Sequence, residues 1–545
     1  MSEYWKYTQE AVLLLITIKL VTLVFKYRKR AIGTSERKDI YPEIPAWPLL
    51  GSLPEVVWNC TNLLEWAAQL ERIYGPGVSL TLPRLRLIEI SRPDWIEHVQ
   101  KTNFQNYVKG SFFHEVMSDV FGQGIFVVDG PAWRSTRQTT TRLFNAQNFQ
   151  AIVTPAMHQT LRSFNDLLSV KAKEGVIVEL DDLFHRFTLD SFLKMTFGRD
   201  SGGLNLVNTG ENSDPFAKAF DFVQKQMDLR FTFSAGSLFL GRILGKRPKT
   251  IAARQTLDQY VYDLIDDRSK ADMRTKTSHD LLGLFMSFCD EKGAPLSRTE
   301  LKDSALNLII AGRDTTAQAL SWTFFHLIKN PELLEPMREE IEGLLPTDED
   351  LVDYNNYKQF KNVLAVFYEA LRLHPSVPKV RPRNYLHLLT LINSLRNAKF
   401  AVKHDKLPDG PLIEPNDCLR WSDWQMARNP NIWGPDCEEF KPSRWIDEDG
   451  KLKQYSQWTF HAFNGGPRIC IGMHLATLEA VAAIVEIVRR YDLVFSPGWL
   501  QSVPKIRKIT PQSKEQTPRY GSSLTLPMAQ PMKVILTRRG QGQNS

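Results

Sequence analysis

The chain has 545 residues, of which 43% are hydrophobic, 24% charged and 11% aromatic. This composition is typical of a globular protein and excludes collagen-like, low-complexity and fully disordered chains. The 68 Lys and Arg residues only slightly exceed the 61 Asp and Glu residues, so nucleic acid is not the expected partner. The five cysteines form no C-x-x-C pair, which argues against a disulfide framework or a structural zinc site and favours a reducing compartment.

The N-terminus carries a candidate membrane anchor. Residues 11–25 read AVLLLITIKLVTLVF, with only Lys19 charged, and a basic cluster follows at residues 26–30. The run covers about 22 Å, short of a hydrocarbon core of about 30 Å, which leaves a signal peptide or an interfacial helix open. Because the basic residues follow the apolar run and no small-residue cleavage site ends it, we predict a retained anchor over residues 1–30. The positive-inside rule then places the remaining chain in the cytosol.

The rest of the chain divides into a connector, a long body and a tail. Four prolines predict a stiff, non-helical connector over residues 31–55, and the polar residues 540–545 predict a frayed tail. In the body, apolar residues recur at helical intervals, as over 256–265 and 301–328, whereas alternating patterns predict hairpins over 78–91 and 523–539. The expected fold class is mainly α with a minor β-sheet subdomain.

The segment that starts HAFNGGPRICIGMHLATLE at His461 carries the sharpest chemical signal. Its Gly-Gly-Pro sequence cannot sustain a helix, and a helical pattern begins at about Met473, so Cys470 is expected on a loop at a helix N-terminus. There the helix dipole and free backbone N–H groups stabilise a thiolate. The glycines would let a flat ligand approach the backbone, and Arg468 could bind its carboxylate.

This loop resembles the haem-binding loop of the cytochrome P-450 family. The pattern F-x-x-G-x-R-x-C-x-G is carried by Phe463, Gly466, Arg468, Cys470 and Gly472. By itself, a lone cysteine at a helix start is usually inert packing. The specificity of the whole pattern therefore makes further matches worth seeking, and three follow.

The first further match is a buried ion-pair motif. Glu369 and Arg372 are similar to the family's E-x-x-R, and Arg444 in FKPSRW is similar to its downstream partner. Alone, E-x-x-R is an ordinary i,i+3 helix pair. With the cysteine loop, it is expected to form a scaffold beneath the haem, with one carboxylate between two guanidinium groups.

The second match, AGRDTT from Ala311, is similar to the family's oxygen-binding helix. Gly312 would remove a side chain where oxygen lies, and a Thr hydroxyl can bond back to a carbonyl and open a kink. Asp314 and Thr315 could then relay protons to the reacting dioxygen. A core helix with a polar break is the alternative interpretation.

The third match is W-x-x-x-R, carried by Trp133 and Arg137 on one helix face. In the family such a pair contacts a haem propionate. The resemblance therefore assigns haem binding to Trp133 and Arg137 together with Arg468, Gly466 and Phe463.

The resemblance covers nearly the whole chain and implies one catalytic domain over residues 56–539. The cofactor would be haem b (iron protoporphyrin IX), with Cys470 as its axial iron ligand, and the reaction insertion of one oxygen atom from O2 into a C–H bond. Because no G-x-G-x-x-G follows a strand, electrons would come from NADPH through a separate NADPH–cytochrome P-450 reductase, with cytochrome b5 as a further partner. A cytosolic catalytic domain on the endoplasmic reticulum membrane is expected. The acidic reductase could meet a basic face formed by Arg134, Arg142, Lys451 and Lys453, each of which is otherwise a solvated surface charge.

The substrate is expected to be hydrophobic. AGRDTTAQALSW and later segments look like the branch that hydroxylates fatty acids and alkanes at or near the terminal carbon, although an apolar pocket also suits sterols and xenobiotics. Each residue expected by family position to line the pocket has simple core packing as its alternative role. The predicted lining is Phe112, Phe113, Phe121, Ile125, Asn307, Ala311, Thr315, Val377, Ser522 and Leu524.

Residues 380–396, VRPRNYLHLLTLINSLR, interrupt the family pattern. Without them the sequence HPSVPKNAKFAVKHDKLPDG fits the family smoothly. We interpret them as the translation of a retained 51-nucleotide intron, with a genuine surface insertion as the alternative. The insert falls beside the haem and the pocket, so it puts the activity of the full chain in question.

Two other functions stay open. One is a lipid peroxide isomerase or dehydratase that needs no reductase, which the Asp314–Thr315 pair argues against because such enzymes need no proton delivery to oxygen. The other is an inactive, haem-free, membrane-tethered binding protein that results from the insert.

Overall fold

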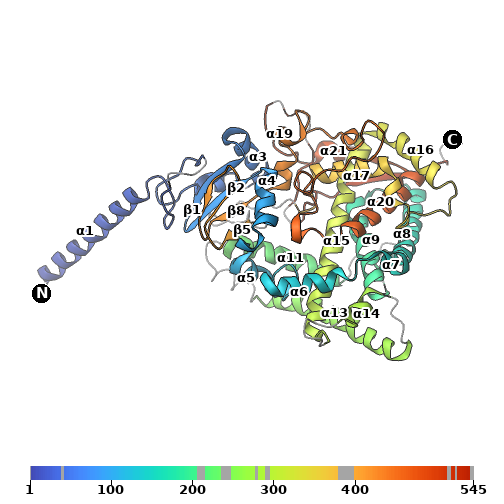
Figure 1. Cartoon of the computed structure of the whole chain (residues 1–545), viewed down its shortest axis with the longest axis horizontal. Coiled ribbons are helices and arrows are strands. Elements are labelled where there is room, and N and C mark those ends of the chain that lie inside the picture. The colour runs from blue at the N-terminus through green and yellow to red at the C-terminus, as the bar shows by residue number, and fades with distance from the viewer. Residues whose placement is uncertain are drawn as a thin grey trace.

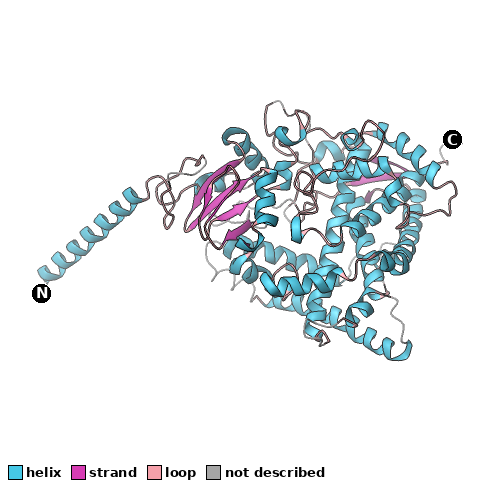
Figure 2. Cartoon of the chain, viewed as in Figure 1, coloured by secondary structure: helices cyan, strands magenta, loops and turns pink. Residues whose placement is uncertain are grey.

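The computed structural model describes residues 2–37, 42–59, 61–199, 201–204, 215–234, 247–275, 280–288, 295–377, 398–511, 513, 517–521 and 525–540. Helix α1 (Ser2–Lys26) projects from a mostly helical body, and the larger group of strands lies on the side of the body nearest to α1 (Figures 1 and 2). The expected fold class, mainly α with a minor β-sheet subdomain, is confirmed. The interrupting segment 380–396 lies outside the described residues.

Helix α1 is long and apolar enough to cross a membrane. The candidate span Tyr4–Lys26 has 23 residues and is not buried against the body. At about 1.5 Å per residue this span covers about 35 Å, which exceeds the hydrocarbon core of about 30 Å. Residues 11–25 alone are too short to cross it, but the helix also includes the residues that flank them. The hydroxyls of Thr17 and Thr22 donate to the carbonyls four residues earlier, at 2.8 and 2.7 Å, which satisfies these polar groups within the helix.

The proline-rich connector lies along the edge of the first sheet. Ile44 donates its backbone N–H to the carbonyl of Ser79 at 3.2 Å, and Ser52 donates to the carbonyl of Thr81 at 2.7 Å. Helix α2 (Leu53–Trp58) then begins, so the last three residues of the expected connector 31–55 are helical. Because the connector contacts a strand by main-chain hydrogen bonds, it is part of the body.

The larger sheet of the described residues has the order β1-β2-β8-β5-β3. The hairpin expected over residues 78–91 is confirmed, because β1 and β2 pair antiparallel from Gly77 with Ile90 to Leu82 with Leu85. Strand β8 runs parallel to β2 and places Arg420 opposite Glu89, with which it forms a buried ion pair. The strands are β1 (Gly77–Leu82), β2 (Leu85–Ile90), β3 (Tyr107–Val108), β5 (Ala398–Ala401) and β8 (Cys418–Arg420).

The hairpin expected over residues 523–539 is wrong. Strand β10 (Lys533–Arg538) pairs instead with β9 (Tyr491–Phe495) and with β4 (Val178–Glu179). An alternating pattern predicts a strand but not its partner, and the prolines at 527 and 531 lack the N–H groups that a second hairpin strand would need. Strands β6 (Asp405–Lys406) and β7 (Leu412–Ile413) form a separate small hairpin.

Helix α15 (Arg298–Lys329) crosses the middle of the body (Figure 1). It begins with a capping box, in which Ser297 accepts the N–H of Glu300 and the Glu300 carboxylate accepts the N–H of Ser297. The helix confirms the periodicity over residues 301–328. The helical patterns predicted over residues 256–265 and after Met473 are confirmed by α13 (Pro248–Thr275) and α20 (Met473–Arg490).

The other α-helices of the described residues are α3 (Leu63–Tyr74), α4 (Pro93–Glu97), α5 (Gly110–Phe121), α6 (Gly130–Thr141), α7 (Ala146–Asn148), α8 (Thr154–Glu174), α9 (Leu180–Phe197), α11 (Pro215–Ser234), α13 (Pro248–Thr275), α14 (Leu281–Met286), α16 (Leu334–Leu344), α17 (Lys361–Leu373), α18 (Asp423–Met426), α19 (Pro430–Trp433), α20 (Met473–Arg490) and α21 (Trp499–Ser502).

Candidate active site

Cys470 lies on a loop that leads into α20. Its backbone N–H donates to the carbonyl of Phe463 at 2.8 Å, which closes the loop. The side chain is accessible to solvent, yet the surrounding protein desolvates the thiol and raises its pKa. A hydrogen bond from Gly472 and the charge of Arg137 lower the pKa by a smaller amount. The helix N-terminus alone therefore does not make a thiolate here, and a bound cation would have to complete the deprotonation.

Two glycines of the cysteine loop allow it to pack closely against other segments of the protein. A Cβ on Gly466 would lie 2.7 Å from the carbonyl oxygen of Gln100, and one on Gly465 would lie 2.4 Å from the Trp458 ring. Gly466 also has a positive φ of 62°. These two glycines therefore have a packing role, and their role in giving a flat ligand access to the backbone stays a prediction.

The structure brings the predicted partners Trp133, Arg137 and Arg468 together beside the cysteine loop. Arg137 donates to the carbonyl of Ile469 at 2.6 Å. The Arg468 guanidinium lies 4.4 Å from the centre of the Trp133 ring, a cation–π contact. Burial and the neighbouring Arg137 lower the pKa of Arg468 to about 10, although Asp129 acts in the opposite direction.

Lys109 completes this group, and no sequence motif marked it. Its ammonium donates to the carbonyl of Phe126 at 2.6 Å. Burial and the charge of Arg468 lower its pKa to about 7. We call Lys109, Arg137 and Arg468 the cationic cluster. Lys109 precedes α5 and meets the others only through folding, so the sequence carries no local signal for it.

The residues of this site fit an iron porphyrin. The thiol is a soft ligand for iron, and the cationic cluster offers positive charge for two carboxylates. Among the described residues, the Nε of Arg468 is buried and has no hydrogen-bond partner. Such a group is costly unless a further acceptor meets it, which a porphyrin carboxylate can do.

One face of α15 is accessible although most of the helix is buried. Ser304, Leu308, Ala311 and Thr315 are partly exposed at intervals of three or four residues, so they share one side. Thr315 donates its hydroxyl to the Ala311 carbonyl at 2.7 Å, as the motif predicts. The helix assignment is continuous through residues 298–329, so the kink expected here stays a prediction. Ser376, on the loop after α17, donates its hydroxyl to the Thr315 carbonyl at 2.8 Å and so holds that loop against α15.

Gly312 has a packing role that the sequence did not reveal. A Cβ at this position would lie 2.3 Å from the Cδ2 atom of Phe192 on α9. The residue is therefore small because α9 crosses α15 closely here. The prediction that its missing side chain makes room for oxygen is replaced by this helix–helix contact.

Asp314 is directed away from the accessible face. It is buried, accepts a hydrogen bond from Gln224 of α11 at 3.2 Å, and lies 3.5 Å from the guanidinium of Arg313. Arg313 also pairs with Asp221 of α11 at 2.9 Å. The two groups of the predicted proton relay, the Asp314 carboxylate and the Thr315 hydroxyl, therefore lie on different sides of α15.

The expected pocket residues differ in what they contact. Asn307 donates to the carbonyls of Phe121 at 2.8 Å and Asp303 at 2.6 Å, so its amide holds the end of α5. Phe113 and Phe121 are buried, whereas Ile125, Ala311 and Val377 are partly buried. The side chain of Phe112 and residues Ser522 and Leu524 lie outside the described part of the chain.

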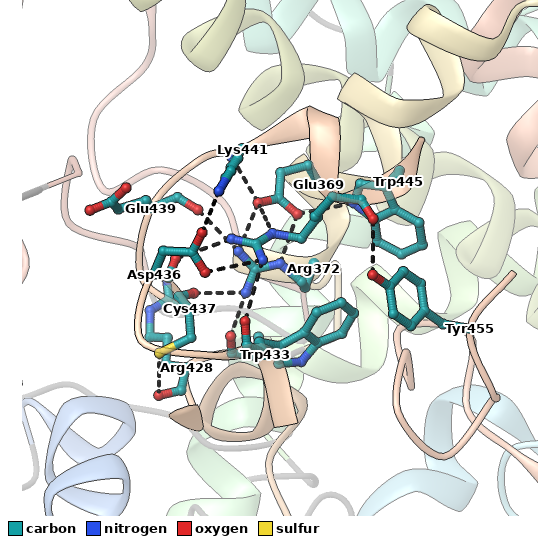
Figure 3. Close-up of polar contacts among 12 residues, drawn as sticks. Glu369, Arg372, Arg428, Trp433, Asp436, Cys437, Glu439, Lys441, Trp445 and Tyr455 are labelled. Carbon is teal, nitrogen blue, oxygen red and sulfur yellow. Dashed lines mark hydrogen bonds and ion pairs between the residues drawn. The ribbon is translucent and has the colours of Figure 1, made fainter. Parts of the chain in front are cut away.

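The E-x-x-R motif forms the cluster shown in Figure 3. Arg372 donates to both carboxylate oxygens of Glu369 at 2.8 Å, and Arg444 donates to the same carboxylate at 2.9 Å. The Trp445 indole at 3.0 Å and the Lys441 backbone at 2.8 Å add two further donors. Burial raises the pKa of Glu369, but the two guanidiniums and these donors outweigh it and hold the pKa below its ordinary value.

Arg372 carries this cluster onward into the loop that precedes Arg444. It donates to the carbonyls of Cys437 at 2.8 Å, Glu439 at 3.1 Å and Ala427. A buried guanidinium with this many acceptors fixes the path of the loop. The cluster is therefore a structural scaffold, as the sequence predicted for Glu369, Arg372 and Arg444.

Comparison with known proteins supplies the family. A model described as Cytochrome P450 matches residues 42–513. The chain belongs to the cytochrome P450 family. Its relatives include Cytochrome P450 monooxygenase cyp1 of Mycosarcoma maydis, 37% identical over 95% of this chain and 78% of the relative. Cytochrome P450 86B1 of Arabidopsis thaliana is 30% identical over 84% and 82%, and the alkane hydroxylase MAH1 of the same plant is 28% identical over 85% and 91%.

Membership of the P450 family establishes the class of chemistry. The protein is a haem-dependent monooxygenase whose electrons derive from NADPH through a reductase. Family members generally act on hydrophobic substrates. The apolar helix α1 has the length and composition of a membrane anchor.

Proposed function

We propose that this P450 hydroxylates long-chain fatty acids or alkanes at or near the terminal carbon. Two observations support the substrate class: the similarity to the alkane hydroxylase MAH1, and the small and apolar residues Leu308 and Ala311 on the accessible face of α15. An apolar wall binds an alkyl chain mainly by removing it from water. Sterols and xenobiotics remain the alternative hydrophobic substrates.

The accessible Cys470 thiol beside the cationic cluster is the single observation that carries the catalytic assignment. We assign Cys470 as the axial iron ligand, and Arg137, Arg468 and Trp133 as the groups that hold the porphyrin carboxylates. The bound haem supplies activation of dioxygen and insertion of one oxygen atom into a C–H bond. The chain's own contribution is to orient the substrate along α15, exclude water, and relay protons by way of Asp314 and the Thr315 hydroxyl.

We further propose that the reductase binds the surface around α6. Arg134 of α6 and Arg142, the residue directly after α6, are exposed, as are Lys451 and Lys453. Exposed basic residues of this kind attract an acidic partner over long range. Reductase-supported turnover should therefore fall with rising ionic strength, and charge reversal of Arg134 should weaken it while haem binding is unchanged.

The first test is the carbon monoxide difference spectrum of the reduced protein. The full chain and a variant that lacks residues 380–396 are expressed, each with and without Cys470→Ala. We expect a Soret band at the thiolate-ligated position that Cys470→Ala abolishes, whereas the control Cys437→Ala retains it, because the Cys437 thiol donates to the Arg428 carbonyl within the cluster around Glu369 (Figure 3). No band in any form would overturn the assignment and favour a haem-free binding protein. A band only in the shortened form would identify the segment as a retained intron.

The second test concerns substrate and location. Dodecanoate, hexadecane and ergosterol are compared for the spin-state shift on binding and for NADPH-dependent product. Turnover of a lipid hydroperoxide without NADPH or reductase would replace the monooxygenase proposal with an isomerase. We also propose residence in the endoplasmic reticulum with the catalytic domain in the cytosol, and expect removal of residues 1–30 to release the protein into the carbonate-soluble fraction of microsomes.

A further inference from the structure

Asp129 occupies a helix N-cap position but does not cap its own helix. It immediately precedes α6, and its side chain makes no capping hydrogen bond there. Its Oδ2 atom instead accepts the backbone N–H groups of Lys109 at 2.9 Å and Gly110 at 3.2 Å, where α5 begins. An aspartate at this position normally binds N–H groups of its own helix, so its acceptor has been diverted to a different helix.

The second carboxylate oxygen of Asp129 holds the cysteine loop. Arg468 donates its Nη2 to Oδ1 of Asp129 at 2.6 Å. The Arg468 side chain is 10% exposed and that of Asp129 25% exposed, so this ion pair is shielded from water far more than a surface pair. A charge-assisted hydrogen bond of this length is about twice as strong as a neutral one. Asp129 thus joins α5, α6 and the loop that carries Cys470.

The start of α5 is built to approach this carboxylate. The first N–H groups of a helix lack partners within the helix, and a negative charge at that end is stabilising. Gly110 has a positive φ of 78°, which a residue with a Cβ rarely adopts. The chain therefore places a glycine where the backbone must turn toward Asp129.

The charges around the site explain why a carboxylate is needed here. Lys109, Arg137 and Arg468 bring three cationic side chains together. Burial lowers the pKa values of Lys109 and Arg468, and the charge of a neighbouring cation adds a smaller lowering to each. Without an anion, mutual repulsion would drive the Arg468 side chain away from its position over Trp133. Asp129 is the anion that keeps Arg468 in place before any ligand carboxylate enters.

We propose that Asp129 is a positioning residue for the cofactor site, which fixes the Arg468 guanidinium and the start of α5 in one frame. The proposal rests on the proposed function, because it takes Arg468 as a ligand for porphyrin carboxylates. Helix α5 also carries Phe113 and Phe121, two of the residues predicted to line the substrate pocket. The Asp129 carboxylate therefore couples retention of the cofactor to the position of this part of the pocket.

The experiment compares Asp129→Ala and Asp129→Asn with the wild-type full chain and with Asp182→Asn. The control removes a carboxylate that pairs with Arg186 on the surface of α9, far along the chain from the cysteine loop. Two quantities are measured: the rate at which bound hemin transfers to apomyoglobin, and the hydrogen–deuterium exchange of peptides that cover residues 109–121. Neither quantity depends on turnover.

We expect Asp129→Ala to release hemin at least about ten-fold faster, the effect of losing one charge-assisted hydrogen bond, and to expose the start of α5 to exchange. Asp129→Asn keeps an acceptor oxygen but loses the charge, so hemin release should accelerate while exchange at α5 changes little. Asp182→Asn should match the wild type in both. Because the asparagine variant keeps the acceptor for α5, it tests the Arg468 contact even if the alanine variant folds poorly.

Two outcomes would overturn the proposal. If both Asp129 variants release hemin within two-fold of the wild-type rate, Arg468 does not depend on Asp129. If hemin release accelerates in Asp129→Ala while exchange at α5 stays at the wild-type level, the two elements are not held in one frame. A wild-type chain that binds no hemin would instead overturn the proposed function, so the two failures are distinguishable.

Discussion

The side-chain amide of Gln224 on α11 donates a hydrogen bond to Oδ2 of Asp314 on α15 over 3.2 Å. Both residues are buried, and Asp314 directly precedes Thr315, whose side chain lies on the accessible face of α15. The same face of α11 pairs Asp221 with Arg313 at 2.9 Å. Two consecutive residues of α15 are thus fixed by two residues of α11 that lie one turn apart.

Gln224→Leu should impair proton delivery without changing cofactor or substrate binding. Removal of the amide leaves the Asp314 carboxylate less well oriented, and a hydrogen bond worth about 0.5–1.5 kcal/mol corresponds to a change of about two- to ten-fold. We expect product formed per NADPH consumed to fall by that factor and the solvent isotope effect to change. The control is Gln226→Leu on the same helix. Unchanged coupling in Gln224→Leu would show that α11 does not position Asp314 for the reaction.

Gly312→Ala should destabilise the protein because its Cβ would meet Phe192. Overpacking of a core site costs about 1–3 kcal/mol. Phe192→Leu removes the ring that the new methyl group would strike, so the double variant should lose about 1–2 kcal/mol less than the sum of the single losses. Urea denaturation of the detergent-solubilised chain measures all four free energies of unfolding. Strict additivity would mean that the close contact between α9 and α15 is not what requires a glycine.

Glu369→Gln should be among the most destabilising single substitutions. It leaves the buried Arg372 and the nearly buried Arg444 without their shared anion, which costs about 3–5 kcal/mol. Lys441→Ala is the control, because it removes only an exposed ammonium and keeps the backbone N–H that binds Glu369. Denaturant unfolding measures the difference, and equal stability of the two variants would contradict the scaffold role.

The Glu369 carboxylate also makes the free energy of unfolding depend on pH in the acid range. The pKa of Glu369 is held below its ordinary value, so its contribution is fully present above about pH 4.5 and is lost as the pH falls through the lower folded-state value. Wild-type protein should therefore lose stability on acidification more steeply than Glu369→Gln, which has no carboxylate to protonate.

A buried histidine pair should make stability fall below about pH 6.5. The Nε2 atoms of His326 and His374 lie 3.0 Å apart, and the rings stack on Phe440 and Trp322. Burial lowers both pKa values well below 6.5. The charges of Lys329, Arg428 and Arg372 lower that of His326 further, and those of His326, Arg428 and Arg372 lower that of His374 further. The unfolded chain therefore binds protons that the folded chain rejects, so stability is full above about pH 6.5 and declines below it.

The slope of that decline is measurable. For each histidine that stays neutral in the fold, the free energy of unfolding falls by about 1.4 kcal/mol per pH unit below about pH 6.5. Replacement of both rings by phenylalanine should flatten the pH dependence of unfolding between about pH 6.5 and 5. Parallel curves for the wild type and the double variant would indicate that both histidines bind protons in the folded chain as readily as in the unfolded chain.

Local patterns in the sequence were sufficient for the elements and for much of the site. Apolar periodicity predicted α13 and α15, alternation predicted the β1–β2 hairpin, and Gly-Gly-Pro followed by a helical pattern located the Cys470 loop. These signals are carried by neighbouring residues, because helices and hairpins form from contacts a few positions apart. The E-x-x-R pair and its Arg444 partner were predictable because a motif names all three residues.

Only the tertiary structure decided which distant residues meet. It joined β10 to β9 and β4, placed Phe192 against Gly312, turned Asp314 toward Gln224, and brought Lys109 and Asp129 to Arg468. None of these pairs is marked by spacing along the chain, since each depends on how whole helices and strands pack in three dimensions. The sequence by itself therefore determined the class of cofactor and the chemistry of the site, whereas packing decided which side chains hold that chemistry in position.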